Sequence, residues 1–270
     1  MTINNFILDY IQKLAEIGCD SPRTDTLAIL EHVLQKDRTY ILAHPEQRFQ
    51  GATLETAKML CNMRVKREPL AYILGKKEFY GRDFMVNPDV LIPRPETENL
   101  ITLALENISA KNLKILDLAT GSGIIGVTLK LERLSWQIDL ADIDQKALEI
   151  AAKNAQNLEA DVLIISSDLL QNTDKKYGLI ITNLPYVPEG LVTSPEIEKE
   201  PKLALFSGDD GLDLYKKFWL EVKSLEKKPK CIITESLESQ HMILTGLAQK
   251  SDYVLVKTLG LAQLYNLNIK

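Results

Sequence analysis

Apolar residues recur at helical spacing through the first 70 residues of the chain. One stripe runs over residues 6–14 and a second over residues 27–34, where Ser21-Pro22 can cap and begin the helix. A third helix is predicted over residues 53–67, because a proline two residues later disfavours helical backbone before it. No strand pattern interrupts this stretch, so residues 1–70 predict a small helical domain.

Residues 71–93 follow a different pattern, in which apolar and aromatic residues alternate around glycines. The segments 72–75, 78–81 and 84–86 carry this pattern, which predicts a β-hairpin linking two domains. The prolines that follow predict the start of a helix, because proline suits the first helical turn and acidic residues suit its positive end.

From residue 113 to the C-terminus, strand and helix patterns alternate. The predicted strands are 113–118, 137–141, 162–166, 179–182 and 231–235, and the predicted helices are 124–134, 145–158, 212–224 and 241–249. Two last strand candidates, 253–257 and 261–267, are too close together for a helix between them. The pattern therefore predicts an α/β domain over residues 94–270, with a parallel, helix-covered sheet that ends in an antiparallel hairpin.

Charge and residue usage narrow the classes of partner. Acidic residues outnumber basic ones by 37 to 32, giving a net charge of -5, whereas proteins that grip nucleic acid usually carry a basic surplus. The cysteines and histidines are scattered without metal-ligand spacing, so no metal site and no disulfide scaffold is expected. No segment approaches the roughly 18 apolar residues of a membrane span. We expect a cytoplasmic protein that is a monomer, because no long heptad pattern is present.

A glycine loop is the first motif with chemical content. In Asp117-Leu-Ala-Thr-Gly-Ser-Gly-Ile-Ile-Gly126 the glycines match GxGxxG between a predicted strand and helix, and Asp142 follows the next strand. Such glycines let a ligand approach the backbone at a helix N-terminus, and the carboxylate can accept hydrogen bonds from two ribose hydroxyls. NAD and S-adenosylmethionine both carry an adenosine ribose, so this motif fits either.

The tetrapeptide Asn183-Leu184-Pro185-Tyr186 indicates which of these two cofactors the chain uses. It follows a predicted strand, at the edge of an open α/β sheet where ligands bind. An amide or exocyclic amino nitrogen is a poor nucleophile, and the Asn183 side-chain oxygen with the Leu184 carbonyl could accept its two N–H bonds. Tyr186 offers a face on which a planar group can stack. Hydride transfer needs no such tetrapeptide, so the motif indicates methyl transfer to nitrogen.

Asp168-Leu169 ends the third predicted strand. Asp168 could accept a bond from an adenine amino group while Leu169 covers the ring. An exposed loop aspartate without a ligand is an equal alternative.

With these motifs assembled, the chain resembles the glutamine N5-methyltransferases that modify peptide chain release factors (the HemK/PrmC family). The resemblance runs from about residue 25 to the C-terminus. Its most specific part is Arg67-Glu-Pro-Leu-Ala-Tyr-Ile-Leu-Gly75, followed by the segment 78–81 and by Val90-Leu-Ile-Pro-Arg-Pro-Glu-Thr-Glu98. A second part consists of Glu200-Pro201, Ala204-Leu205, Gly208 and Asp210-Gly211-Leu212.

The resemblance implies a Rossmann-like class I methyltransferase sheet, with S-adenosylmethionine as cofactor and release factors as partners. It implies substrate recognition by residues 1–70, a hairpin linker over 71–93 and a methyltransferase domain over 94–270. Asn183, Pro185 and Tyr186 would be catalytic, and Asn183 to Tyr186 would receive the glutamine of a Gly-Gly-Gln loop, bordered by Arg94, Pro95 and Glu96. The cofactor would contact Ala119, Thr120, Gly121, Ser122, Gly123, Asp142, Asp168, Leu169 and Asn183.

The chain departs from the family pattern at several positions. Leu184 replaces the first proline of Asn-Pro-Pro-Tyr, and Ala119 stands where glycine is usual. Residues 235–240 keep the Glu and Gln of an E-x-G-x-x-Q pattern but not its glycine, and the last hairpin lacks a usual Asp and Arg.

Four other functions compete with this interpretation, one of which is methylation of glutamine or another amide in a different protein. Asn-Leu-Pro-Tyr is also the tetrapeptide of rRNA adenine dimethyltransferases, although the acidic balance and residues 67–98 do not suit that family. A non-catalytic cofactor-binding module and an NAD dehydrogenase are the remaining alternatives.

Overall fold

The protein is described by a computed structural model that covers residues 1–174, 176–191 and 194–268. The chain divides into two compact units. One consists of Met1–Gly75 together with Ser194–Lys199, and the other of Lys76–Thr193 together with Glu200–Lys270. The smaller unit is therefore discontinuous in sequence, since it includes a short segment from the second half of the chain.

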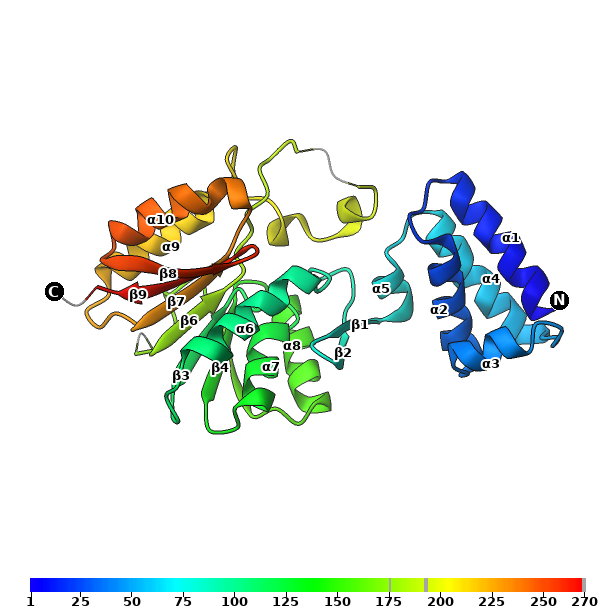
Figure 1. The fold of residues 1–270 in the computed structure, drawn as a ribbon, viewed down its shortest axis with the longest axis horizontal. Coiled ribbons are helices and arrows are strands. Elements are labelled where there is room, and N and C mark those ends of the chain that lie inside the picture. The colour runs from blue at the N-terminus through cyan, green and yellow to red at the C-terminus, as the bar shows by residue number, and fades with distance from the viewer. Residues whose placement is uncertain (175, 192–193, 269–270) are drawn as a thin grey trace. The chain divides into compact units, whose positions relative to one another are not determined.

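The smaller unit is helical, as the apolar stripes predict (Figure 1). Side chains from both predicted stripes, among them Phe6, Tyr10 and Leu30, form its buried cluster. Ser21 is the N-cap of the second helix, but its hydroxyl donates to the Asp25 carboxylate at 2.7 Å rather than capping the backbone. The helices are α1 (Ile3–Glu16), α2 (Pro22–Leu34), α3 (Arg38–Ala43), α4 (Gly51–Val65) and α5 (Leu70–Leu74).

The last of these helices corrects one prediction. Residues 72–74 were expected in the hairpin, but they belong to α5, which Pro69 precedes and Gly75 ends. Gly75 has a φ of 70°, a left-handed conformation that glycine adopts without a Cβ clash and that terminates helices. Leu70, Ile73 and Leu74, at the helical spacing i, i+3 and i+4, pack in the apolar cluster of the smaller unit, so the helical turn directs these three side chains to one side. The hairpin itself is shorter, with β1 (Lys76–Phe79) antiparallel to β2 (Arg82–Met85).

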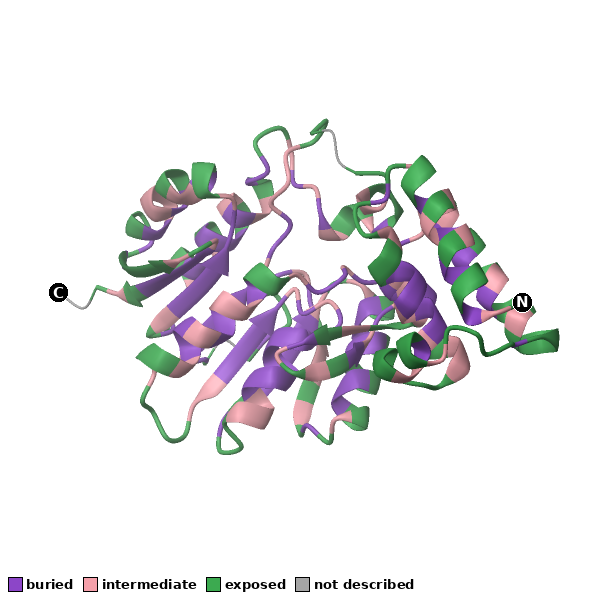
Figure 2. Cartoon of the chain, turned by 45° about the vertical axis from the view of Figure 1, so that its right-hand side comes forward, coloured by how far each residue is buried: buried purple, intermediate pink, exposed green. Residues whose placement is uncertain are grey.

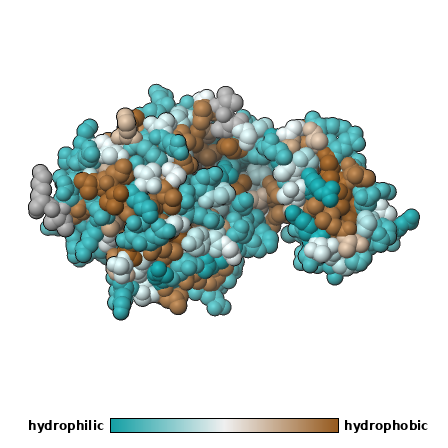
Figure 3. All heavy atoms as spheres, in the orientation of Figure 1, coloured by the Kyte–Doolittle hydropathy of each residue, from teal (hydrophilic) through white to brown (hydrophobic). Residues whose placement is uncertain are grey.

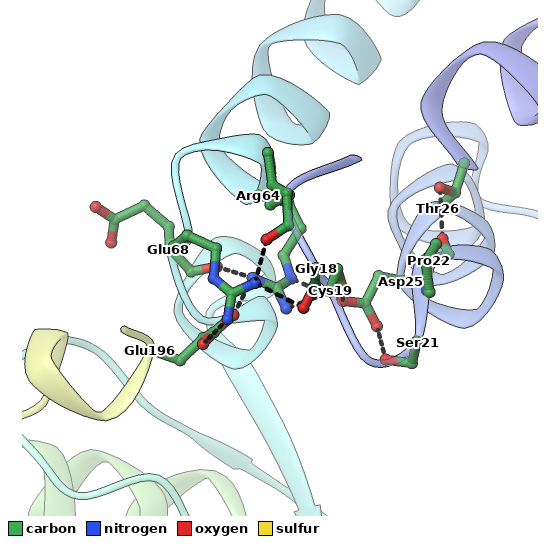
Figure 4. A network of polar contacts seen from close by, with 11 residues as sticks. Gly18, Cys19, Ser21, Pro22, Asp25, Thr26, Arg64, Glu68 and Glu196 are labelled. Carbon is green, nitrogen blue, oxygen red and sulfur yellow. Dashed lines mark hydrogen bonds and ion pairs between the residues drawn. The ribbon is translucent and has the colours of Figure 1, made fainter. Parts of the chain in front are cut away.

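A buried ionic network connects the helices of the smaller unit (Figure 4). Arg64 of α4 donates from Nε to Asp25 Oδ2 at 2.7 Å and from Nη1 to Glu196 Oε1 at 2.8 Å. The second carboxylate oxygen of Glu196 accepts from Arg67 Nη2 at 2.8 Å. The side chains of Arg64 and Asp25 are only 8% and 5% exposed. These bonds fix the segment Ser194–Lys199 in the helical unit.

The larger unit is built on a seven-stranded mixed sheet, as the alternating pattern predicts. Its strand order is β5-β4-β3-β6-β7-β9-β8. The first five strands in this order run parallel, and β9 pairs antiparallel with both β7 and β8. The strands are β3 (Lys114–Leu118), β4 (Gln137–Asp142), β5 (Val162–Ser166), β6 (Leu179–Thr182), β7 (Cys231–Glu235), β8 (Tyr253–Leu259) and β9 (Ala262–Leu267).

Helices cover both faces of this sheet. Alternate strand residues point to opposite faces, so Ile115 joins the apolar cluster that contains α6, α7 and α8, and Leu116 joins the cluster that contains α9 and α10. Figure 2 shows the buried strands between helices whose outer surfaces are exposed. The remaining elements of the larger unit are η1 (Pro95–Thr97), α6 (Glu98–Asn107), α7 (Ile124–Glu132), α8 (Gln145–Asn157), η3 (Lys202–Ala204), α9 (Asp213–Ser224), η4 (Glu238–Gln240) and α10 (His241–Gln249), while η2 (Ile197–Lys199) belongs to the smaller unit.

The exposed apolar side chains are distributed over both units. On the face shown in Figure 3, hydrophobic residues form separate patches among hydrophilic ones. Leu220 and Met242, from α9 and α10, are 69% and 87% exposed. Across the parts of the chain that the structure describes, no helix is long and apolar enough to span a bilayer.

Candidate active site

A cleft opens in the larger unit, at the carboxyl ends of β3, β4, β5 and β6. The strand order reverses between β3 and β6, and such switch points are where open α/β sheets bind ligands. Pro95, Glu96, Gly123 and Tyr186 are not among the residues that line it. The predicted site residues that do line it are Arg94, Ala119, Thr120, Gly121, Ser122, Asp142, Asp168, Leu169, Asn183, Leu184 and Pro185.

The glycine loop connects β3 to α7 along one wall of the cleft. Asp117, the fourth residue of β3, is fully buried and accepts bonds from Thr120 Oγ1 at 2.5 Å and from the Gly126 N–H at 2.8 Å. Gly126 lies so close to the sheet that a Cβ there would stand 2.1 Å from the Leu140 side chain. The glycine pattern thus lets α7 pack against β4 while Asp117 holds the loop.

Asp142 lies at the end of β4, beside this loop. It accepts from the Gly121 N–H at 2.9 Å and from the Asp144 N–H at 3.0 Å, one bond on each oxygen. A carboxylate has about four lone-pair sites, so two remain for a ligand in the cleft. Ile143, which also lines the cleft, is 56% exposed and offers an apolar surface next to this carboxylate. The pair can therefore hold a ribose and cover an adjoining apolar ring.

Asp168 has only one carboxylate oxygen left, without a partner among the described residues, for the predicted bond to an adenine amino group. Its Oδ2 accepts from Lys217 Nζ at 2.7 Å and from Gln171 Nε2 at 3.3 Å. A bond to an adenine amino group would therefore use Oδ1. Leu169 lines the cleft beside it with a φ of 47°.

Asn183 follows β6 and has a defined side-chain orientation. Its Nδ2 donates to Glu235 Oε1 at 2.9 Å and to Thr97 Oγ1 at 3.3 Å. Since the amide nitrogen faces these two groups, Oδ1 points the other way. Asn183 also lines the cleft, so an acceptor oxygen is available to a ligand there.

Several residues of the region were not predicted as site residues, among them Ile143, Thr97 and Glu200, and two others hold the tetrapeptide. Glu235 ends β7, is fully buried, and accepts on the same oxygen from Asn183 Nδ2 and from the Tyr186 hydroxyl at 3.0 Å. Burial raises the pKa of the Glu235 carboxyl, and hydrogen bonds from Thr97, Tyr186 and Asn183 oppose that rise. Gln240 Nε2 donates to the Tyr186 carbonyl at 2.8 Å. The sequence did contain a signal for these two residues, since Glu235 and Gln240 are the retained ends of the E-x-G-x-x-Q pattern. Both form hydrogen bonds to the tetrapeptide.

A buried carboxylate fixes the opposite border of the cleft. Glu200, whose side chain is 1% exposed, accepts from Arg94 Nη2 at 2.5 Å and from the Ile92 N–H at 3.0 Å. The segment before η1 is thereby tied to the segment after the tetrapeptide. The neighbouring predicted residues, Pro95 and Glu96, begin η1.

Ala119 adopts a backbone conformation that favours glycine, with a φ of 55°. For an L-residue this region costs about 1–2 kcal/mol, whereas glycine avoids the strain but loses about 0.5–1 kcal/mol of chain entropy. Ala119→Gly should therefore raise the free energy of unfolding by up to about 1 kcal/mol, measured by urea denaturation. Ala152→Gly is the matched control, because Ala152 is exposed in α8. This substitution should lower the free energy of unfolding by about 1 kcal/mol. A loss at both positions would show that Ala119 is not strained.

Asp117 should make the stability of the larger unit depend on pH. Burial raises the pKa of its carboxyl to about 7. Between about pH 4 and pH 7 the folded chain then keeps a proton that the unfolded chain releases, so stability falls as the pH rises through this window, by on the order of 4 kcal/mol. Asp117→Asn should flatten the curve, measured by urea denaturation from pH 4.5 to pH 8. Parallel curves for the two proteins would contradict the assignment.

Comparison with known proteins agrees with this geometry. A family model described as the PrmC N-terminal domain matches residues 7–75, and one described as the methyltransferase small domain matches residues 98–200. A release factor glutamine methyltransferase of Bacillus anthracis is 37% identical over 235 residues, which cover 83% of this chain and 82% of the relative. One of Coxiella burnetii is 39% identical over 207 residues, covering 76% and 75%.

A crystal structure of a ribosomal protein L11 methylase from Lactobacillus delbrueckii subsp. bulgaricus has the same fold, with a TM-score of 0.50 at 16% identity. The match covers 72% of this chain and 89% of that one. This likeness confirms the class I methyltransferase sheet, while the closer relatives confirm the resemblance seen in the sequence. The chain belongs to the family of S-adenosylmethionine-dependent release factor glutamine methyltransferases.

Proposed function

We propose that this protein transfers a methyl group from S-adenosylmethionine to the side-chain amide nitrogen, N5, of the glutamine in the Gly-Gly-Gln loop of peptide chain release factors. The observation that carries the proposal is the orientation of Asn183, whose amide oxygen is left for a ligand in the cleft. The substrate class comes from relatives named release factor glutamine methyltransferase.

The cleft suits S-adenosylmethionine in its donor set. Asp142 keeps lone pairs for two ribose hydroxyls, and Ile143 lies beside it for the adenine ring. Residues 119–123 form the wall next to these groups and would hold the methionine part, although Gly123 itself does not line the cleft. We assign Asp168 and Leu169 to the adenine end, with Asp168 acting through Oδ1.

The tetrapeptide would prepare the nitrogen for attack. S-adenosylmethionine, when bound, supplies an electrophilic methyl group on a positively charged sulfur. Asn183 Oδ1 and the Leu184 carbonyl would accept the two N–H bonds of the glutamine amide, which positions the nitrogen for in-line attack. No strong base is needed before transfer, because the nitrogen becomes acidic once it is methylated.

The neighbouring tetrapeptide residues would complete the glutamine site. The Tyr186 hydroxyl donates to Glu235, which fixes the hydroxyl end of the side chain; the glutamine amide would stack on this ring, although Tyr186 itself does not line the cleft. The Leu184 side chain is 1% exposed and packs in the apolar cluster on the α9 and α10 face. It thereby anchors the loop where the family pattern has proline. Pro185, with Arg94 at the border, would shape the entrance.

The helical unit would seat the release factor, and its match to the PrmC N-terminal domain supports this assignment. The net charge of -5 supports a protein partner over nucleic acid. We also expect a monomer in solution, and light scattering at twice the chain mass would contradict that.

The test is methyl transfer from labelled S-adenosylmethionine, with purified release factor and ribosomal RNA offered in parallel. Mass spectrometry then locates the label. One methyl group on the glutamine of the Gly-Gly-Gln loop supports the proposal. Label on adenine would support the second candidate, an adenine N6-methyltransferase, which the Asn-Leu-Pro-Tyr tetrapeptide favours. Cofactor binding without transfer to either substrate would favour a non-catalytic module.

A further inference from the structure

We propose that Glu235 is a positioning residue that determines which atom of the Asn183 side chain faces the cleft. The inference rests on the proposed function, because it concerns how the same site presents an acceptor to a glutamine amide. Glu235 does not line the cleft, and it acts through Asn183 and Tyr186.

An asparagine side chain presents two ends of nearly equal size, an acceptor oxygen and a donor nitrogen. A substrate amide nitrogen needs the oxygen, since a second N–H group pointing at it would repel it. A half-turn of the Asn183 amide would thus replace the required acceptor with a donor while leaving the shape of the site unchanged. The site needs a group that distinguishes the two orientations.

The contacts of Glu235 supply this distinction. Its Oε1 lies 2.9 Å from Asn183 Nδ2, and a carboxylate oxygen accepts hydrogen bonds without donating any. Turning the amide would bring two acceptor oxygens together in a fully buried position. Thr97 also contacts Asn183 Nδ2, at 3.3 Å, and because its hydroxyl proton is donated to the Glu235 carboxyl it can only accept from Asn183, which favours the same orientation. The Glu235 carboxylate therefore determines that the amide oxygen of Asn183, and not its nitrogen, faces the cleft.

The other oxygen of Glu235 indicates what an amide would do at this position. Oε2 is buried without a hydrogen-bond partner among the described residues. That space tolerates an unpaired acceptor, whereas an NH2 group would leave two buried donors unpaired. In Glu235→Gln the new NH2 group should therefore turn toward Asn183 and Tyr186. Asn183 would then rotate to accept it, presenting its own NH2 group to the cleft.

We expect Glu235→Gln to lower kcat for release factor methylation by about 10- to 100-fold while the Kd for S-adenosylmethionine stays within about threefold. The control is Thr234→Val, which is isosteric, buried in the same strand, and without a described hydrogen bond to Asn183 or Tyr186. It should stay within about twofold of the wild-type kcat. An unchanged kcat in Glu235→Gln would overturn the proposal.

A swap of the two functional groups separates positioning from a structural effect. In Asn183→Asp/Glu235→Gln the amide is at position 235 and donates to a carboxylate at position 183, whose second oxygen faces the cleft. We expect the double variant to exceed the product of the two single-variant activities by at least tenfold. A purely structural role of Glu235 predicts no such recovery, so multiplicative losses would overturn the inference.

Failure of the proposed function is detected separately. If wild-type protein does not methylate release factor, the substrate assignment fails, and the orientation can still be read by NMR. The Asn183 side-chain NH2 signals, identified by their loss in Asn183→Ala, should exchange slowly with solvent in the wild type. They should exchange at least tenfold faster in Glu235→Gln, where the NH2 group faces the cleft. Equal exchange rates would overturn the orientation role whatever the substrate is.

Discussion

Replacing Asn183 with alanine is expected to lower kcat for release factor methylation by about two to three orders of magnitude, the loss typical of one preorganised group that acts on the reacting atoms. The variant removes the acceptor oxygen that the cleft presents. Binding of S-adenosylmethionine should persist, because Asp142 and the glycine loop are unaffected. Single-turnover methylation with labelled cofactor measures the loss, and calorimetry measures cofactor binding.

The control is Asn157→Ala, since Asn157 is exposed at the end of α8 and does not line the cleft. It should keep wild-type kcat. Asn183→Ala also removes one donor to the buried Glu235 carboxylate, so a loss of about 1–3 kcal/mol in stability is expected alongside. Full activity in Asn183→Ala would refute the acceptor role, whatever its stability.

Replacing Arg64 with alanine should cost the helical unit about 3–5 kcal/mol of stability. The substitution leaves the Asp25 carboxylate buried at 5% exposure without its cationic partner, and uncompensated buried charges cause losses of this size. It also removes one of the two arginines that hold Glu196. Urea denaturation followed by far-UV circular dichroism should show an earlier transition for this unit.

Arg38→Ala is a control of the same chemistry in the same unit. Arg38 pairs with Glu31 at 2.6 Å, but its side chain is 47% exposed. Exposed ion pairs contribute about 0–1 kcal/mol, so this variant should unfold close to the wild-type midpoint. Similar losses of stability in both variants would mean that burial does not determine how much the Arg64 network contributes to the free energy of unfolding.

The sheet was predictable because its strands are short apolar runs with clear ends. Strands β5, β6 and β7 have the predicted bounds, and the close spacing of the last two strands correctly predicted their antiparallel pairing. Helix α5 was assigned wrongly because its apolar residues run directly into Gly75 and the aromatic segment that follows, as hairpin residues also do. Its helical form places Leu70, Ile73 and Leu74 together in the apolar cluster of the smaller unit, a contact that periodicity over five residues does not reveal.

The candidate site was predictable only where a motif is continuous in sequence. The glycine loop, Asp142 and the tetrapeptide follow strand ends, and their meeting at one edge follows from parallel pairing. Glu235 and Thr97 were not predicted as site residues because each acts through a hydrogen bond to Asn183, which lies 52 and 86 residues away in the sequence. Such a bond depends on which buried atoms meet across elements, which residue spacing does not reveal.

The discontinuity of the helical unit has a consequence for recombination between related chains. A crossover after Gly75 would exchange residues 1–75 but leave Ser194–Lys199 from the other parent. Glu196 would then meet whatever residues the incoming helices carry at positions 64 and 67. A working chimera therefore needs two exchanged segments, because the helical unit is inherited as a pair of sequences.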